Sequence, residues 1–307
     1  MKLILVVLDP TAEAQPALDK AALLARRTGA RLRLFCCDRD PRMVLRRLLD
    51  PEALSAGRAA FLAGRRDGLA GLAEPWAAAG IEVEIEAAWD GPVHAAVLRE
   101  VGLCEPDLVV KDTHWHGPLR LGLFTSTDWY LIQDCPVPLL LAKPGPWAPR
   151  PRVVAAVDPG HPGDPADVLD HAILRAAERV VADVDGELAV VHAFLPVDPA
   201  LLAAAPGMPV AGIPAAGQAP EDLRSRAGAT LAALLEGHRC PAAAVHLVEG
   251  NAVDALPEFC TGHRADLLVA GSMSRSRVYQ RVIGSTAERL LDQIPCDLLV
   301  VHAPRAA

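Results

Sequence analysis

Short apolar runs alternate with segments of helical periodicity along the whole chain. The first run, KLILVVLDP, is rich in leucine and valine and ends at Asp9 and Pro10, as a buried parallel strand would. Residues 16–28 follow with apolar positions at helical spacing and stop at Gly29, a residue that commonly ends helices. The same alternation predicts further strands at 31–37, 81–87, 107–110 and 138–142, and further helices at 51–79, 92–102 and 126–133.

One predicted strand, residues 81–87, differs from the others because apolar and acidic residues alternate in it. Its sequence, IEVEIEA, puts a carboxylate at every second position. This pattern is typical of an edge strand or of a strand with one face in water. We therefore expect it at a less buried place in the sheet than the uniformly apolar runs.

The second half of the chain repeats this order of elements. The run PRVVAAVDP, which contains Asp158, matches KLILVVLDP at the start. Residues 266–269 align with residues 107–110 without a gap, at an offset of 159 (266 − 107), and the same offset brings Ser285 onto Ser126. The elements predicted in this half are strands at 187–193, 243–248, 266–270 and 297–301 and helices at 164–182, 220–238, 251–261 and 285–293.

The proline-rich segment KPGPWAPRP, residues 143–151, separates the two halves, because its prolines suit neither a strand ladder nor a helix interior. We predict two domains, at residues 1–145 and 152–307. Each is an α/β unit with a doubly wound, five-stranded parallel sheet of Rossmann-like type. Ligands of such sheets bind beyond the carboxyl ends of the strands, where the strand order reverses. Asp9 and Asp158, each following a first strand, are expected at those points.

The segment after the fourth strand of the second copy has the features of a phosphate-binding loop. It reads GSMSRSRVYQRVIGSTAERLL, and Gly271 lets the chain turn directly after the strand. Gly284 precedes a helix that Ser285 or Thr286 is placed to cap. Backbone N–H groups and the dipole at a helix start favour an anion such as phosphate, to which Arg275 adds a positive charge. The alternative is a strand-end turn followed by an ordinary helix cap.

These motifs together resemble the universal stress protein family. Its nucleotide-binding members show G-x2-G-x9-G-S/T between the fourth strand and the last helix. This chain has Gly271, Ser274 in place of the second glycine, and Gly284. The aspartate that ends the family's first strand corresponds to Asp158, and IPCDLLVV resembles the family's closing strand. In the first half, LVVLDP, LVVKDTHWH, LFTSTDW and CPVPLLL look most like the tandem, E-type members.

The resemblance implies an adenine nucleotide alpha hydrolase-like fold and a stress-response binding or regulatory role, with ATP held by the second copy. Asp158 would contact the adenosine part. The phosphates would be surrounded by Gly271, Ser272, Ser274, Arg275, Gly284, Ser285 and Thr286. If the position of Ser274 needs a positive φ, serine costs about 1–2 kcal/mol there, which weakens a site without abolishing it.

The first copy departs from this pattern at all three glycine positions. By the same offset, Asp112, Trp115 and Thr125 stand in place of the glycines, while Ser126 and Thr127 remain as a helix cap. Side chains, one of them acidic, thus occupy positions that should let phosphate approach the backbone. We predict that the first copy does not bind ATP.

A weak ATPase is the alternative from the class of enzymes. The sequence contains no nucleophile–base pattern, no G-x-S-x-G elbow and no H-E-x-x-H motif. Any hydrolysis would therefore rest on positioning of the nucleotide alone and would be slow.

The loop KDTHWH of the first copy offers a candidate metal site. In an extended loop His114 and His116 point the same way, and with Asp112 or His94 they would form a site for a divalent metal such as zinc. The alternative is a polar loop that replaced a lost phosphate site, because two histidines do not complete a tetrahedral site.

Residues 195–220 form a long segment rich in proline, alanine and glycine. In the simplest interpretation this segment is a surface loop. Its apolar side chains favour burial, however, so a lid over a hydrophobic ligand is the alternative. These side chains are Leu201, Leu202, Met208, Val210 and Ile213. In this alternative, the protein would be a scaffold that binds a hydrophobic ligand or a metal without nucleotide.

Composition and charge further limit the classes of protein to which the chain can belong. The chain has 307 residues, 51% apolar and 22% charged, as expected for two folded domains. The net charge of −8 argues against a nucleic-acid partner. No apolar run is long enough to span a membrane and no secretory signal is recognisable, so we expect a cytoplasmic protein. The seven cysteines include no C-x-x-C pair and are expected to be buried small hydrophobes.

The two closing strands, at 138–142 and 297–301, are expected to meet. In the family, separate chains pair through this edge. A covalent tandem would satisfy the contact within one chain, as an intramolecular pseudo-dimer, and would hide both edges. Association of two such chains into a homodimer is a further alternative.

Overall fold

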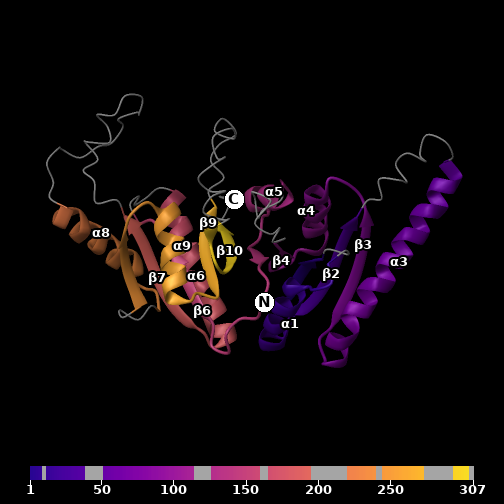
Figure 1. The fold of residues 1–307 in the computed structure, drawn as a ribbon, viewed down its shortest axis with the longest axis horizontal. Coiled ribbons are helices and arrows are strands. Elements are labelled where there is room, and N and C mark those ends of the chain that lie inside the picture. Colours follow the sequence, from indigo (N-terminus) through magenta and orange to yellow (C-terminus); the bar gives the residue numbers. More distant parts are fainter. Residues whose placement is uncertain are drawn as a thin grey trace. The chain divides into compact units, whose positions relative to one another are not determined.

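The computed structural model describes residues 1–8, 12–38, 51–113, 126–159, 165–194, 220–239, 244–272 and 293–303. The chain divides into two compact units. Unit 1 is formed by Met1–Pro149 together with Asp297–Val300, and unit 2 by Arg150–Cys296 together with Val301–Ala307. Figure 1 labels most of the helices and strands of both units.

The sheet of unit 1 has the strand order β3-β2-β1-β4-β5-β10. All neighbours are parallel except β5 and β10, which are antiparallel. The strands are β1 (Leu3–Val7), β2 (Arg31–Asp38), β3 (Val83–Trp89), β4 (Leu108–Asp112), β5 (Leu139–Ala142) and β10 (Asp297–His302). The expected meeting of the two closing strands is therefore confirmed, with Leu299 opposite Leu140 and both side chains buried.

The described helices of unit 1 are α1 (Pro16–Thr28), α3 (Pro51–Ala78), α4 (Val93–Cys104) and α5 (Ser126–Asp134). Right-handed crossovers put α1 and α3 on one face of the sheet and α4 and α5, which contact each other, on the other. The bounds of α1 are those expected from the sequence. Pro16 has no N–H to lose in the first turn, and Gly29 adopts the left-handed conformation (φ 73°) that closes the helix on the carbonyl of Ala25.

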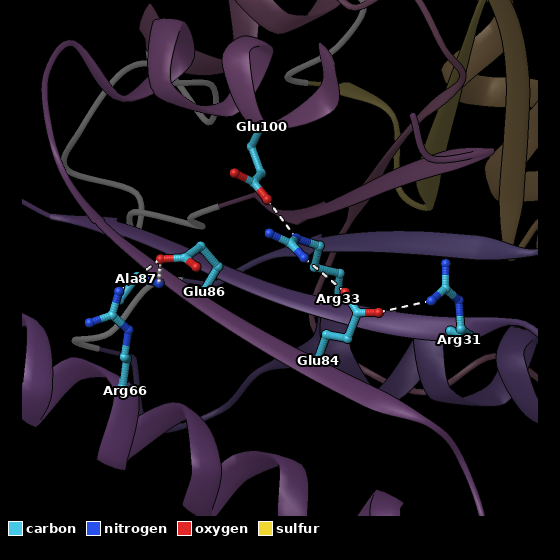
Figure 2. A network of polar contacts seen from close by, with 7 residues as sticks. All are labelled: Arg31, Arg33, Arg66, Glu84, Glu86, Ala87 and Glu100. Atoms are coloured by element: carbon cyan, nitrogen blue, oxygen red, sulfur yellow. Dashed lines mark hydrogen bonds and ion pairs between the residues drawn. The ribbon is translucent and has the colours of Figure 1, made fainter. Parts of the chain in front are cut away.

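The strand with alternating carboxylates, β3, lies at the edge of the sheet of unit 1, as the sequence predicts. Figure 2 shows how charges hold it. Glu84 accepts hydrogen bonds of 2.8 Å from Arg31 and Arg33 on β2, and Glu86 accepts one of 3.1 Å from Arg66 on α3. Arg33 also donates to the buried Glu100 of α4, at 2.5 Å. Paired carboxylates along this strand thus link it to both of its neighbouring elements.

Unit 2 contains a parallel sheet with the described strand order β9-β6-β7-β8. Its strands are β6 (Arg152–Ala156), β7 (Glu187–Phe194), β8 (Val245–Glu249) and β9 (Leu267–Ser272). Its described helices are α6 (Pro165–Val184), α8 (Pro220–Leu235) and α9 (Ala252–His263), and the Asn251 side chain caps α9 by accepting from the N–H of Val253. The α/β fold predicted from the repeat is therefore observed in both units. The helix predicted at 285–293 lies almost wholly outside the described residues.

No helix within the described ranges is long and apolar enough to cross a membrane. The six described cysteines are all free, and all except Cys104 are buried. Burial raises the pKa of Cys36 and of Cys135 to about 11, so both thiols stay protonated at neutral pH. The buried cysteines are core residues, as expected, and Cys104 is half-buried.

Candidate functional site

The first copy's counterpart of the phosphate loop begins with a buried aspartate that caps a helix of the same unit. Asp112, at the end of β4, is 4% exposed, and its Oδ1 accepts a hydrogen bond of 2.6 Å from the backbone N–H of Ala17. Gln15, the residue at the N-cap of α1, makes no such bond with its own side chain. The carboxylate of Asp112 therefore supplies the negative charge that the start of α1 favours.

A second buried charge pair lies beside it. The ammonium of Lys111 is 2.9 Å from Oδ1 of Asp128, in the first turn of α5, and also donates to the carbonyl of Asp112. Both side chains are buried. A bound phosphate at this helix start would have to compete with the carboxylate of Asp128, which the protein itself provides.

In unit 2, the corresponding edge is formed by the carboxyl ends of two adjacent parallel strands. Ala155 on β6 lies opposite Val269 on β9, so Asp158 and Ser272, which follow these strands, reach the same edge of the sheet. The strand order reverses between these two strands, since β6 leads to β7 on its other side. The side chain of Asp158 is 75% exposed, and Ser272 is half-buried. Asp158 therefore stands at the switch point that the sequence predicts for it.

Two residues around Asp158 were not anticipated from the sequence. Oδ1 of the buried Asp170, on α6, accepts a hydrogen bond of 3.0 Å from the N–H of Asp158. Nδ1 of the buried His192 is 3.1 Å from the carbonyl of Val157, which fixes its proton on that nitrogen, and 3.9 Å from the carboxylate of Asp158. The sequence does contain one indication of this role: Asp170 lies among the apolar positions of the helix predicted at 164–182.

Burial raises the pKa of Asp170 from 3.8 to about 6, and the hydrogen bond from the N–H of Asp158 offsets part of that rise. The nearby carboxylates of Asp158 and Asp167 act in the same direction as burial. Asp170 thus changes charge at about pH 6 while its carboxylate accepts the hydrogen bond from the backbone N–H of Asp158.

Gly271 has a packing role in unit 2. A β-carbon at this position would lie 2.5 Å from Cδ2 of Leu169 and 3.0 Å from Cδ1 of Ile173, both on α6. The glycine therefore lets α6 approach the end of β9 closely. Because packing alone requires it, this glycine is not independent evidence for a phosphate.

The remaining predicted site residues lie outside the described residues. For the nucleotide these are Ser274, Arg275, Gly284, Ser285 and Thr286; for the metal they are His114 and His116; most of the segment 195–220 is also among them. His94, considered as a further metal ligand, stacks on Tyr130 with ring centroids 4.0 Å apart. Within the ranges that the structure describes, no group of three or more His, Cys, Asp or Glu side chains is placed to hold a metal ion.

Comparison with known proteins gives one consistent result. A model of the universal stress protein family matches residues 1–143 and again residues 150–302. Universal stress protein E of Photorhabdus laumondii is 28% identical over 308 residues, which cover 97% of this chain and 94% of that protein. Universal stress protein E of Escherichia coli K12 is 27% identical over 306 residues, covering 97% and 92%.

Solved structures agree with this at the level of the fold. A functionally unknown protein from Pseudomonas aeruginosa has a TM-score of 0.74 and 24% identity, with 99% of this chain and 93% of that chain covered. A universal stress protein from Archaeoglobus fulgidus has a TM-score of 0.65 and 17% identity, covering 98% and 96%. At these identities the similarity shows the α/β architecture in duplicate.

Proposed function

Because this chain belongs to the universal stress protein family, with two such domains in tandem, we propose that it is a binding or regulatory protein of stress tolerance that takes ATP in its second domain. The observation that carries the proposal is the exposed carboxylate of Asp158 at the switch point between β6 and β9. A carboxylate there accepts hydrogen bonds from the adenosine part of a nucleotide. Ser272, at the end of β9, leads directly into the segment with Ser274, Arg275 and Gly284.

The difference between the two units supports placing ATP in the second domain alone. In unit 1 the buried carboxylate of Asp112 is committed to α1, and Asp128 already brings a negative charge to the start of α5. Both carboxylates repel phosphate. Unit 2 has Gly271 at the position of Asp112, so this obstacle is missing there.

The test is calorimetric titration of the whole chain with magnesium ATP. We expect one nucleotide for each chain. Asp158→Ala should weaken binding about ten-fold, the value of one hydrogen bond to a charged group. Gly284→Trp should abolish binding, because the bulky ring occupies the position where phosphate approaches the backbone.

The first domain supplies matched controls. Asp9→Ala and Thr125→Trp make the same substitutions at the counterparts of Asp158 and Gly284 and should leave ATP binding unchanged. No heat at millimolar ATP, or undiminished binding by Gly284→Trp, would refute the proposal. Two nucleotides for each chain would refute its restriction to the second domain.

A further inference from the structure

Unit 1 contains a cavity of about 600 Å³ at the carboxyl ends of β4 and β5. Its described walls are the first turns of α1, the end of β4 at Asp112, and the segment after β5 that includes Trp147. This volume is within the range of small-molecule sites. The described lining includes Asp112 and Thr113, at the end of β4, where the first copy's counterpart of the phosphate loop begins.

A buried ion pair fixes part of the cavity wall. The ammonium of Lys20, on α1, lies 2.7 Å from Asp297 and donates to the carbonyl of Lys143 at 2.6 Å. Asp297 also accepts a hydrogen bond of 2.7 Å from the indole N–H of Trp147. Two large side chains of the wall, those of Lys20 and Trp147, are therefore held in place by one carboxylate.

The counterpart of Lys20 in unit 2 is Leu169, by the offset of the two first helices (165 − 16 = 149). Leu169 lies over Gly271, the counterpart of Asp112. In unit 1 this position is Lys20, which forms an ion pair with Asp297. Unit 1 therefore lacks a leucine at the position from which Leu169 packs over Gly271 in unit 2. The exchange of leucine for lysine and of glycine for aspartate thus makes this end of the strand polar.

Among the described lining residues of the cavity, negative charges outnumber positive ones. Lys20 and Asp297 neutralise each other, whereas Asp19 and Asp112 add two carboxylates to the lining. Asp112 is buried and bound to the start of α1, but Asp19 is exposed and available to a ligand. The other walls are largely apolar and include Leu23 and the indole of Trp147. An aromatic ring beside a carboxylate attracts cations.

We propose that this cavity binds an amphipathic organic cation, with its apolar ring against Leu23 and Trp147 and its protonated amine toward Asp19. The site is distinct from the nucleotide site proposed above, since it lies in the other unit and selects the opposite charge. Anions of the same size are repelled by the two carboxylates.

The experiment uses three ligands of similar shape, naphthylmethylammonium, naphthylmethanol and naphthylacetate, titrated by calorimetry against the whole chain. We expect the ammonium to bind about ten-fold more tightly than the neutral alcohol, as a charge-assisted hydrogen bond gives, and the carboxylate more weakly than either. Asp19→Asn should lower the affinity for the ammonium to that for the alcohol and leave the affinity for the alcohol unchanged. Leu23→Trp, which fills the cavity at a half-buried position, should abolish binding of all three.

Asp67→Asn, at an exposed position on α3, is the control for removal of one negative charge and should change nothing. The Asp158→Ala variant should still bind the ammonium compound with unchanged affinity, which separates this proposal from the one on ATP. Equal affinity for the alcohol and the ammonium, equal effects of Asp19→Asn and Asp67→Asn, or no binding of any ligand would overturn the inference. So would undiminished binding by a folded Leu23→Trp variant.

Discussion

The side chain of Leu169 occupies the space that a β-carbon on residue 271 would need, with Cδ2 only 2.5 Å from that position. A glycine that the family pattern associates with phosphate is thus also part of the core between α6 and β9. The same position in unit 1 is Asp112, whose carboxylate binds the first helix instead. The two copies therefore differ at this position in how a helix is anchored.

Gly271→Ala should destabilise the protein by about 1–3 kcal/mol, because overpacking forces α6 or the Leu169 side chain to move. Urea denaturation measures the change. Gly262→Ala is the matched control: its new methyl group meets open space in α9 and should stabilise by about 0.5–1 kcal/mol. Leu169→Ala in the Gly271→Ala background should restore part of the loss, and an unchanged denaturation midpoint for Gly271→Ala would contradict the packing role.

Asp170→Asn should stabilise the protein at neutral pH and not at acid pH. The folded-state pKa, about 6, lies above the unfolded value of 3.8, so between these values the folded state holds a proton that the unfolded chain has lost. The contribution of this proton is present below about pH 4 and is lost as the pH rises through about 6. Asparagine keeps the acceptor for the N–H of Asp158 but does not ionise, so we expect a gain of about 1–3 kcal/mol at pH 7.5.

The measurement is the free energy of unfolding of both proteins between about pH 4 and pH 8. Glu258→Gln, at an exposed position on α9, serves as the control for a change of surface charge. A constant difference between Asp170→Asn and the unchanged protein over the whole range would show that Asp170 does not titrate as stated.

Lys20→Met should destabilise the protein by about 3–5 kcal/mol, because it leaves the carboxylate of Asp297 buried without its ammonium partner. Burial already raises the pKa of Asp297, and Lys20 offsets part of that rise. Adding Asp297→Asn should recover part of the loss, so a double-mutant cycle measures the coupling. Arg224→Met breaks the exposed pair with Glu249 and should cost less than about 1 kcal/mol; similar losses in both cases would contradict this account.

Asp112→Ala should cost about 0.5–2 kcal/mol, the usual value of a lost helix cap. Asp112→Asn keeps an acceptor for the N–H of Ala17 and should retain most of that stability. Thermal or urea unfolding of the two variants measures the difference. Equal losses for alanine and asparagine would mean that the charge, and not the hydrogen bond, provides the stabilisation.

Much of the architecture was predictable, because local patterns carry it. Pro16 and Gly29 mark the ends of α1, and the alternating carboxylates of residues 81–87 predict the edge position of β3. The repeated strand and helix order predicts two α/β units. Each of these inferences needs only neighbouring residues and the periods of helix and strand.

The candidate site was less predictable. The sequence indicates Asp158 as a switch-point residue, and its exposure and position agree. It does not indicate that Asp170 holds the backbone of Asp158, or that Leu169 requires Gly271. Helical periodicity identifies which residues face the sheet but not which partner each of them meets.

The sequence by itself thus determined the order of elements, the duplication and the family, since each rests on local periodicity or on a repeated motif. Only the tertiary structure decided which carboxylates are buried and what they bind. Asp112 and Ala17 are 95 residues apart and Lys20 and Asp297 are 277 apart. Such contacts form only when the sheet brings distant segments together, and burial then makes each polar partner obligatory, because a buried charge without one is strongly destabilising.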